Sequence, residues 1–335
     1  MVKVSILIPA YNEEASLKYL FERLEAMMDA NEKFAWEVLM VNDGSKDNTL
    51  MVLAQMHEKD NRFNYLDLSR NYGKEVAMLA GFDYVTGDCM IIMDADLQHP
   101  PEIIPEMLKY WEEGYDDVYA RRKVREGESY VRKKISLLFY SFLQKITNVE
   151  IQQDTGDFRL LDKTCIIALR TMRETQRYTK GLYSWIGFSK KEILFEQQAR
   201  IAGVSKWNYF KLSDLAIEGI TSFTILPLRI SSFIGMFVSL GAFIYMIYVF
   251  IQALIYGDPA RGYPTMMVVI LFLGGFQLLS LGIIGEYLGR IFMETKNRPP
   301  YFARLYNGKK IENINSVDKI TNGNYLNHGN INNYK

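Results

Sequence analysis

The stretch Met90-Ile-Ile-Met-Asp94-Ala-Asp96-Leu-Gln98-His-Pro-Pro101 places two carboxylates and an amide directly after an apolar run. Along an extended backbone, side chains at positions i, i+2 and i+4 project on the same side. We therefore expect the oxygens of Asp94, Asp96 and Gln98 to converge at the carboxyl end of a buried strand, where open α/β sheets bind ligands. Hard oxygen donors with open coordination positions favour Mg²⁺ or Mn²⁺ bridging the phosphates of a substrate.

Strand and helix patterns alternate around this stretch over the first 120 residues. Short apolar runs predict strands over residues 4–9, 37–42, 63–67, 88–93 and 117–120. Between them, apolar residues at helical spacing predict helices around 17–28 and 50–57, and over 74–85 and 102–113. This alternation predicts an α/β fold with a mostly parallel sheet that helices cover on both faces.

The charge balance and the cysteines exclude several classes of protein. Lys plus Arg and Asp plus Glu both total 39 in 335 residues, so the formal net charge is zero and nucleic acid is not an expected partner. Cys89 and Cys165 are too few for a disulfide framework and lack a metal-binding spacing. The N-terminal run contains Pro9 and lacks the features of a signal peptide, so we expect the first domain to stay in the cytoplasm.

Two long apolar runs lie in the second half of the chain. Residues 233–255 and 263–285 contain no charged side chain and are long enough to span a bilayer, which predicts two transmembrane helices within 229–293. Basic residues precede the first run and follow the second, whereas the turn between them holds only Arg261 beside Asp258. By the positive-inside rule we expect a multi-pass protein of the cell (inner or plasma) membrane with both termini cytoplasmic.

Amphipathic stretches precede these runs. Residues 130–147 and 209–226 carry apolar side chains at helical spacing, and basic residues flank the first stretch. This pattern is typical of a helix in the membrane interface, with a core helix of a soluble domain as the alternative. We assign residues 1–228 to a cytoplasmic domain that includes both helices. The remaining segment, 294–335, is expected to be a cytoplasmic tail, disordered from about residue 307 where Asn and Gly predominate.

Two further polar loops follow predicted strands. Residues 9–13 read Pro-Ala-Tyr-Asn-Glu and residues 42–45 read Asn-Asp-Gly-Ser. Both lie at the same sheet edge as the Asp94 loop, where Tyr11 would pack against a base. Glu13 and Asp43 would accept hydrogen bonds from a ribose or a pyrimidine. Helix capping by Asn12 and Asp47 is the alternative role of these loops. Neither a G-x-G-x-x-G after the first strand nor a P-loop motif is present, which disfavours those nucleotide sites.

Together with the Asp94–Gln98 stretch, these loops resemble those of family 2 inverting glycosyltransferases. More closely, the chain resembles the polyprenyl-phosphate sugar transferases, the group of the dolichol-phosphate mannose synthases and the bacterial bactoprenol glucosyltransferases. The resemblance covers nearly everything from Val4 to about Tyr301. It is extended by Asp154-Thr-Gly-Asp157-Phe-Arg159, Lys180-Gly-Leu182, Arg200-x5-Lys206-Trp207 and Lys296-Asn-Arg-Pro-Pro-Tyr301.

The resemblance implies a GT-A fold, two transmembrane helices and a metal-dependent hexosyl transfer in cell-envelope glycan modification. The implied donor is a nucleotide sugar, with UDP favoured over GDP, and the implied acceptor is a polyprenyl phosphate such as undecaprenyl phosphate at the cytoplasmic face of the bilayer. The implied metal ligands are Asp94, Asp96 and Gln98. The implied nucleotide-sugar contacts are Pro9, Tyr11, Asn12, Glu13, Asp43, Lys74 and Asp94.

The resemblance also assigns residues to the acceptor and to catalysis. The residues implied at the lipid phosphate are Arg121, Arg132, Ser136, Arg200 and Lys206. Arginine binds phosphate through charge-assisted, often bidentate hydrogen bonds. Attraction of a basic cluster to anionic lipid heads is the alternative. Asp157 lies at the position of the family's proposed catalytic carboxylate. Asp96 is implied as the second catalytic residue. Orienting Arg159 or the metal site is the alternative role of Asp157.

Other functions share parts of this pattern. One is a family 2 glycosyltransferase with another lipid or glycan acceptor, although a processive synthase is disfavoured because Gln-x-x-Arg-Trp does not occur. Another is an inactive membrane scaffold or transport partner, which the intact carboxylates argue against. Pairs of glycines at 274–275 and at 282 and 285 would permit close helix packing, and therefore a homo-oligomer.

Overall fold

The computed structural model describes residues 1–123, 155–174, 177–196, 226–256 and 262–311. These residues form two compact units. The first contains everything described before residue 197 together with residues 299–311, and the second contains 226–256 and 262–298.

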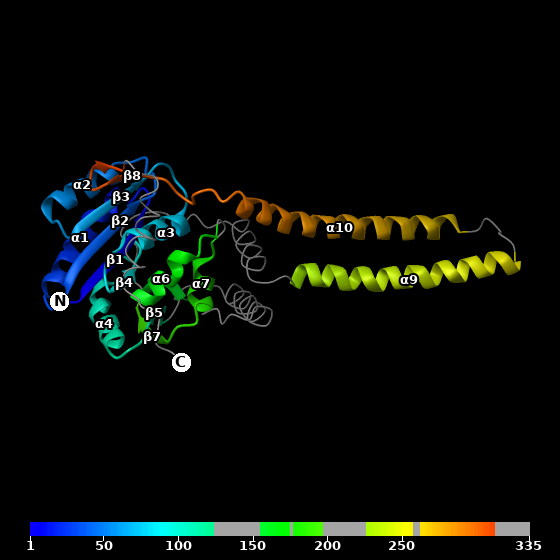
Figure 1. Cartoon of the computed structure of the whole chain (residues 1–335), viewed down its shortest axis with the longest axis horizontal. Helices are drawn as coiled ribbons and strands as arrows, with labels where there is room; N and C mark the ends of the chain where they lie inside the picture. The colour runs from blue at the N-terminus through cyan, green and yellow to red at the C-terminus, as the bar shows by residue number, and fades with distance from the viewer. Residues whose placement is uncertain (124–154, 175–176, 197–225, 257–261, 312–335) are drawn as a thin grey trace, which may run out of the picture. The chain divides into compact units, whose positions relative to one another are not determined.

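The first unit is built on one mixed sheet (Figure 1). Its described strands are β1 (Lys3–Ala10), β2 (Ala35–Asn42), β3 (Phe63–Leu68), β4 (Cys89–Ile92), β5 (Asp117–Arg122), β6 (Thr155–Asp162), β7 (Lys190–Phe195), β8 (Ala303–Tyr306) and β9 (Lys309–Lys310). They lie in the order β7-β5-β6-β4-β1-β2-β3-β8-β9. The central strands β4, β1, β2 and β3 are parallel, which confirms the expected parallel arrangement there. Strand β6 runs antiparallel between β4 and β5, and β8 runs antiparallel to β3.

Helices cover both faces of this sheet, as the alternating patterns predicted. The helices of the first unit are α1 (Glu14–Asp29), α2 (Thr49–Lys59), α3 (Lys74–Tyr84), the 3₁₀ turn η1 (Pro101–Ile103), α4 (Ile104–Glu112), α6 (Lys163–Thr171) and α7 (Thr179–Trp185). On one face, Ile6 and Ile8 of β1 join the core that contains the apolar side of α1. On the other, α3 lies so close that a Cβ on Gly81 would stand 2.1 Å from a methyl carbon of Leu7. Successive strand residues point to opposite faces, so β1 is buried on both sides.

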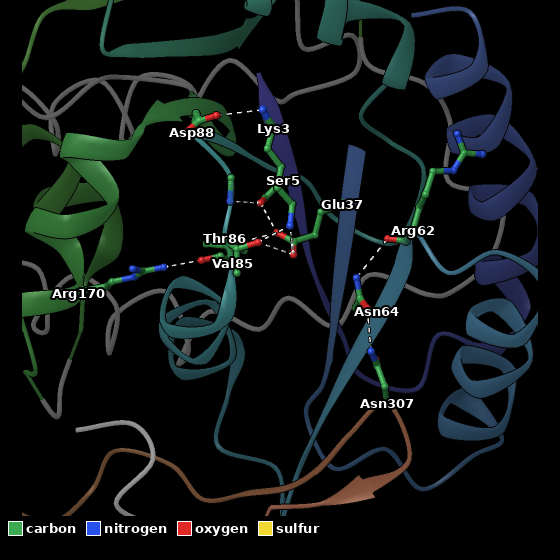
Figure 2. A network of polar contacts seen from close by, with 11 residues as sticks. Lys3, Ser5, Glu37, Arg62, Asn64, Val85, Thr86, Asp88, Arg170 and Asn307 are labelled. Carbon is green, nitrogen blue, oxygen red and sulfur yellow. Dashed lines mark hydrogen bonds and ion pairs between the residues drawn. The ribbon is translucent and has the colours of Figure 1, made fainter. Parts of the chain in front are cut away.

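A buried carboxylate joins three segments near the amino ends of β1 and β2 (Figure 2). Glu37 accepts hydrogen bonds from the Ser5 hydroxyl at 2.5 Å and from the Thr86 backbone N–H at 3.0 Å, and Lys3 Nζ lies 3.1 Å from it. Burial alone would raise the pKa of Glu37, but these hydrogen bonds and the Lys3 charge outweigh it, so the pKa is lowered. The network fixes the loop between α3 and β4 against the sheet.

The chain returns to this sheet after the second unit. Strands β8 and β9 extend it beyond β3, and Asn307 donates to Asn64 at 2.7 Å and accepts from the Tyr65 backbone N–H at 2.8 Å (Figures 1 and 2). The expected disorder from about residue 307 is therefore wrong for residues 307–311. The Asn- and Gly-rich composition misled the prediction because the hydrogen bonds of Asn307 to β3 and the pairing of β9 with β8 satisfy this backbone. Residues 312–335 lie outside the described residues.

The second unit consists of two long helices, α9 (Leu226–Tyr256) and α10 (Tyr263–Thr295). They contain the predicted runs 233–255 and 263–285, and both are long and apolar enough to cross a membrane. Large apolar side chains such as Phe237, Leu278 and Leu288 are exposed on them. The predicted interfacial helices at 130–147 and 209–226 lie outside the described residues, apart from the first residue of α9.

Replacing Glu37 by Gln should lower the free energy of unfolding by about 1–3 kcal/mol at neutral pH, because buried donors lose a carboxylate acceptor. A lowered pKa in the folded state means that this contribution is present above the ordinary value of 4.5 and disappears as the pH falls through the lower folded pKa. The difference between the native chain and Glu37→Gln should therefore shrink in acid. Urea unfolding in detergent, followed by tryptophan fluorescence, measures it. Glu22→Gln on the exposed face of α1 is the control, with an expected change below about 0.5 kcal/mol.

Candidate active site

Strand pairing brings the candidate catalytic residues to one edge of the sheet. The carboxyl ends of β1, β2 and β4 lie at this edge because these strands are parallel. Strand β6 is antiparallel to β4, with Ile92 opposite Arg159. Continuing this register by two residues in each direction places Asp94 opposite Asp157. Two carboxylates that are 63 positions apart in the sequence therefore meet beyond the end of β4.

The stretch after β4 is a turn and not the extended strand that the sequence suggested. β4 ends at Ile92, residues 95 and 96 form a turn, and Leu97 has a left-handed φ of +59°. Side chains nevertheless alternate in exposure: Asp94, Asp96 and Gln98 are half-buried, whereas the residues between them are buried. The Gln98 backbone N–H donates to Asp96 Oδ1 at 3.2 Å, which stabilises the turn.

The buried ring of His99 stabilises this turn. Its ring is 2% exposed and stacks on Phe158, with centroids 4.8 Å apart and an interplanar angle of 14°. The Asp94 backbone N–H donates to His99 Nδ1 at 3.3 Å, so this nitrogen acts as an acceptor. Burial lowers the pKa of His99, although the Asp94 charge opposes the shift, and the ring is therefore neutral at pH 7. The sequence pattern predicts no role for His99, although this residue lies in the stretch 90–101.

Lys74 joins the two carboxylates. It is the first residue of α3, and its Nζ lies 2.5 Å from Asp94 Oδ1 and 2.6 Å from Asp157 Oδ2. Burial would raise the pKa of both carboxyls, but the Lys74 charge, with a further contribution from Lys180, outweighs it and lowers both. Burial would lower the pKa of Lys74, but the two carboxylates raise it well above its ordinary value. All three groups are charged at neutral pH.

Asp94, Asp96 and Gln98 bring two carboxylates and an amide to this turn, which are the oxygen donors that suit a divalent cation, and a metal bound there stays a prediction. Asp157 Oδ1 is buried without a hydrogen-bond partner in the described part of the chain, which marks a place for a polar or charged group. The described residues contain no cluster of three His, Cys, Asp or Glu side chains that could hold a metal. Two carboxylates and the Gln98 amide would therefore leave coordination positions for a substrate, as Mg²⁺ sites in phosphate-binding enzymes do.

Asp43 braces the loop that leads into Lys74. Its two carboxylate oxygens accept the backbone N–H groups of Tyr72 at 2.7 Å and Gly73 at 2.9 Å. Burial raises the pKa of Asp43, although these bonds oppose the shift. Gly44, with φ of +62°, packs directly on the same loop, where a Cβ would stand 2.4 Å from the Arg70 carbonyl carbon. Asp43 thus has a structural role that the sequence analysis did not anticipate.

The first polar loop is held against the second. The Asn12 backbone N–H donates to Ser45 Oγ at 3.0 Å, and Asn12 Oδ1 accepts the Lys46 N–H at 2.8 Å. The Glu13 backbone N–H donates to Thr49 Oγ1 at 2.9 Å. Pro9 is part of β1, and Tyr11 is exposed beside these contacts. The structure therefore brings the loops at 9–13 and 42–45 together.

Two further charged residues lie near Asp157: Glu75, which the sequence pattern did not single out, and Arg159, which belongs to the motif around Asp157. Glu75 follows Lys74 in α3 and accepts the Thr179 backbone N–H at 3.2 Å. Burial raises its pKa, and the neighbouring Asp157 charge raises it further. Arg159 Nη1 lies 2.9 Å from Asp117 Oδ2 in an ion pair that is almost fully buried. In the sequence, the only signal for Glu75 is its position next to Lys74.

Most of the residues that we expect at the lipid phosphate lie outside the described residues. Arg121 is the penultimate residue of β5, and its Nη2 lies 3.2 Å from Glu192 Oε1. Arg132, Ser136, Arg200 and Lys206 lie outside the described residues. The grouping of these five side chains therefore stays a prediction.

Known proteins match both parts of the chain. A model of glycosyl transferase family 2 matches residues 5–169, and a model described as the GtrB C-terminal hairpin matches residues 226–291. An uncharacterized glycosyltransferase of Synechocystis is 44% identical, and the match covers 90% of this chain and 95% of that protein. A bactoprenol glucosyl transferase of Shigella phage SfX is 38% identical, with 90% and 99% covered. Among solved structures, glucosyl-3-phosphoglycerate synthase from Mycobacterium tuberculosis matches 66% of this chain and 78% of its own, with 14% identity and a TM-score of 0.46.

Gly44→Ala should weaken nucleotide binding by roughly tenfold or more, because the methyl group meets backbone atoms of the 70–71 loop and the residue keeps a left-handed φ. Titration of the nucleotide into the full chain measures this effect. Gly114→Ala is the matched control: its φ is +101°, but nothing lies within 4 Å of the added Cβ. It should reduce stability without changing affinity. Equal losses of affinity in both variants would contradict a role of the Gly44 contact in the nucleotide site.

Proposed function

Because this chain belongs to glycosyl transferase family 2, we propose that it moves one sugar from a nucleotide sugar to a polyprenyl phosphate at the cytoplasmic face of a membrane. The observation that carries the proposal is the charged group of Lys74, Asp94 and Asp157 at the carboxyl edge of the sheet, beside two braced polar loops. The resemblance found in the sequence is confirmed, since relatives at 38–44% identity cover nine-tenths of the chain.

The acceptor class follows from the relatives that match both units. The Shigella phage protein is named a bactoprenol glucosyl transferase, and the match spans the α/β unit and the two long helices. A lipid acceptor agrees with helices that expose large apolar side chains along their length. We propose that α9 and α10 anchor the enzyme in the bilayer with both termini cytoplasmic, and that Arg121 with the basic residues at 132, 200 and 206 receives the lipid phosphate.

The donor diphosphate would lie at the Asp94 turn. Asp94, Asp96 and Gln98 would hold Mg²⁺ or Mn²⁺, and the metal would supply positive charge to neutralise the leaving diphosphate. Lys74 keeps Asp94 and Asp157 ionised, and the loops at 9–13 and 42–45 receive the nucleoside, with UDP the favoured donor nucleotide. Asn12 and Asp43 act chiefly by holding these loops in place.

The acceptor needs little help in losing a proton. A phosphate monoester has a second pKa of about 6, so much of it is a dianion at pH 7. Its oxygen attacks the anomeric carbon from the side opposite the nucleotide, and one displacement inverts the configuration. We propose that Asp157, with one oxygen on Lys74 and the other without a partner in the described residues, positions the acceptor or the metal.

Asp96→Asn should abolish sugar transfer while the protein stays folded and membrane-bound, because the leaving diphosphate loses its charge neutralisation. The assay incubates the full chain with undecaprenyl phosphate, a panel of nucleotide sugars and Mg²⁺ or Mn²⁺, and identifies the lipid product by mass. Asp29→Asn, at the exposed end of α1, is the control and should keep full activity. Metal-independent transfer by Asp96→Asn would contradict the assignment of Asp96 as a metal ligand.

Asp157→Asn should lower kcat, and raising the pH from about 7 to 9 should not restore it. The pKa of Asp157 is already lowered by Lys74, and a dianionic acceptor leaves little for a general base to do. Initial rates over this pH range measure the effect, with the native chain as reference. Recovery of most of the rate at pH 9 would show that Asp157 acts as a base. A product that retains the donor's anomeric configuration would exclude a single displacement.

A further inference from the structure

The segment that follows the second long helix pairs with β3, the strand beside β2 and its loop at 42–45. We call residues 301–307 the strap. Its strand β8 pairs antiparallel with β3, with Leu66 opposite Tyr306, and the Ser69 backbone N–H donates to the Phe302 carbonyl at 2.9 Å. Tyr301 donates to the buried Asp83 of α3 at 2.7 Å. The strap is therefore part of the α/β unit and converts β3 from an edge strand into an internal one.

The strap supplies the cation for a carboxylate that the sheet buries completely. Asp67 of β3 is 0% exposed. Arg304 Nε and Nη2 lie 2.7 Å and 2.6 Å from its Oδ2. A buried carboxylate without an opposite charge and hydrogen bonds is strongly destabilising, so Asp67 depends on this pair.

The other carboxylate oxygen of Asp67, Oδ1, fixes the loop at 42–45 through Asn42. Asn42 Nδ2 donates to Asp67 Oδ1 at 2.7 Å, and Asn42 Oδ1 accepts the Ser45 backbone N–H at 3.3 Å. Ser45 Oγ in turn accepts the Asn12 backbone N–H at 3.0 Å. A continuous series of hydrogen bonds thus runs from Arg304 to both loops that we assign to the nucleotide.

We propose that Arg304 is a positioning residue for the nucleotide-sugar donor. It holds Asp67 in the orientation that fixes Asn42, and through Asn42 it keeps the loops at 42–45 and 9–13 in their binding arrangement. This inference rests on the proposed function only in naming the nucleotide sugar as the ligand. Without Arg304, the Asp67 carboxylate turns toward water and releases Asn42, so the donor site loosens while the chemical step on bound donor changes little.

A purely stabilising strap makes a different prediction. In that case any loss of contact between the strap and β3 lowers Tm, and the molecules that remain folded bind the donor as before. Asn307 supplies the matched comparison. It lies on the same strap, with φ of +47°, and its side chain bonds to Tyr65 and Asn64 but not to Asp67. Asn307→Gly removes these bonds and suits the left-handed backbone.

The experiment measures the nucleotide Kd by calorimetric titration of the detergent-solubilised full chain, together with Tm, kcat and the KM values for donor and acceptor. Arg304→Met should raise the donor Kd and KM by about tenfold, with kcat and acceptor KM within about threefold. Arg304→Lys should recover part of the affinity. Asn307→Gly should lower Tm and leave the donor Kd within about twofold.

A double variant keeps the test decisive if Arg304→Met folds poorly. Asp67→Asn removes the buried charge but keeps an oxygen that can accept from Asn42, so Asp67→Asn combined with Arg304→Met should regain stability and most of the affinity. An unchanged donor Kd in Arg304→Met, or an equal rise in Asn307→Gly, would overturn the proposal. The nucleotide Kd is measured without turnover. A native chain that binds nucleotide but transfers no sugar would therefore contradict the proposed function, whereas the Kd values of Arg304→Met and Asn307→Gly would still decide the role of Arg304.

Discussion

The arrangement of the active site depends on one cation between two carboxylates. Lys74 Nζ contacts both Asp94 and Asp157, which come from a turn after β4 and from β6. Two like charges, of which Asp157 is buried and Asp94 half-buried, repel each other at short range. The lysine makes their approach favourable and keeps both ionised at neutral pH. The beginning of α3 is therefore a structural part of the charged centre.

Hydrogen bonds fix the loops around this centre. Asp43 accepts two backbone N–H groups from the segment before Lys74, and Asn12 bonds to the neighbouring loop. The buried apolar sheet below supplies the rigid base from which these contacts extend. Such a site is pre-organised for a charged ligand, since its polar groups are oriented before the ligand arrives. Under the proposed function, this ligand is a nucleotide sugar with a divalent metal.

Among the described residues, the chain passes from the α/β unit to the second unit and then returns. Helices α9 and α10 lie in the segment that matches the GtrB C-terminal hairpin, and residues 299–311 belong to the α/β unit again. The returning segment buries the edge of β3 and compensates the charge of Asp67. The two long helices therefore lie, in the sequence, between β7 and β8, two strands of the same sheet.

The amino-acid sequence by itself determined the alternation of strands and helices, the two long apolar helices and the position of the Asp94 stretch at a strand end. These features are local, since side-chain periodicity and length encode them. Only the tertiary structure decided that Lys74 lies between Asp94 and Asp157, that His99 supports the turn and that Arg304 pairs with Asp67. These contacts join residues 5 to 237 positions apart, and they depend on strand order and register. No local pattern encodes that register, because it results from packing the whole sheet.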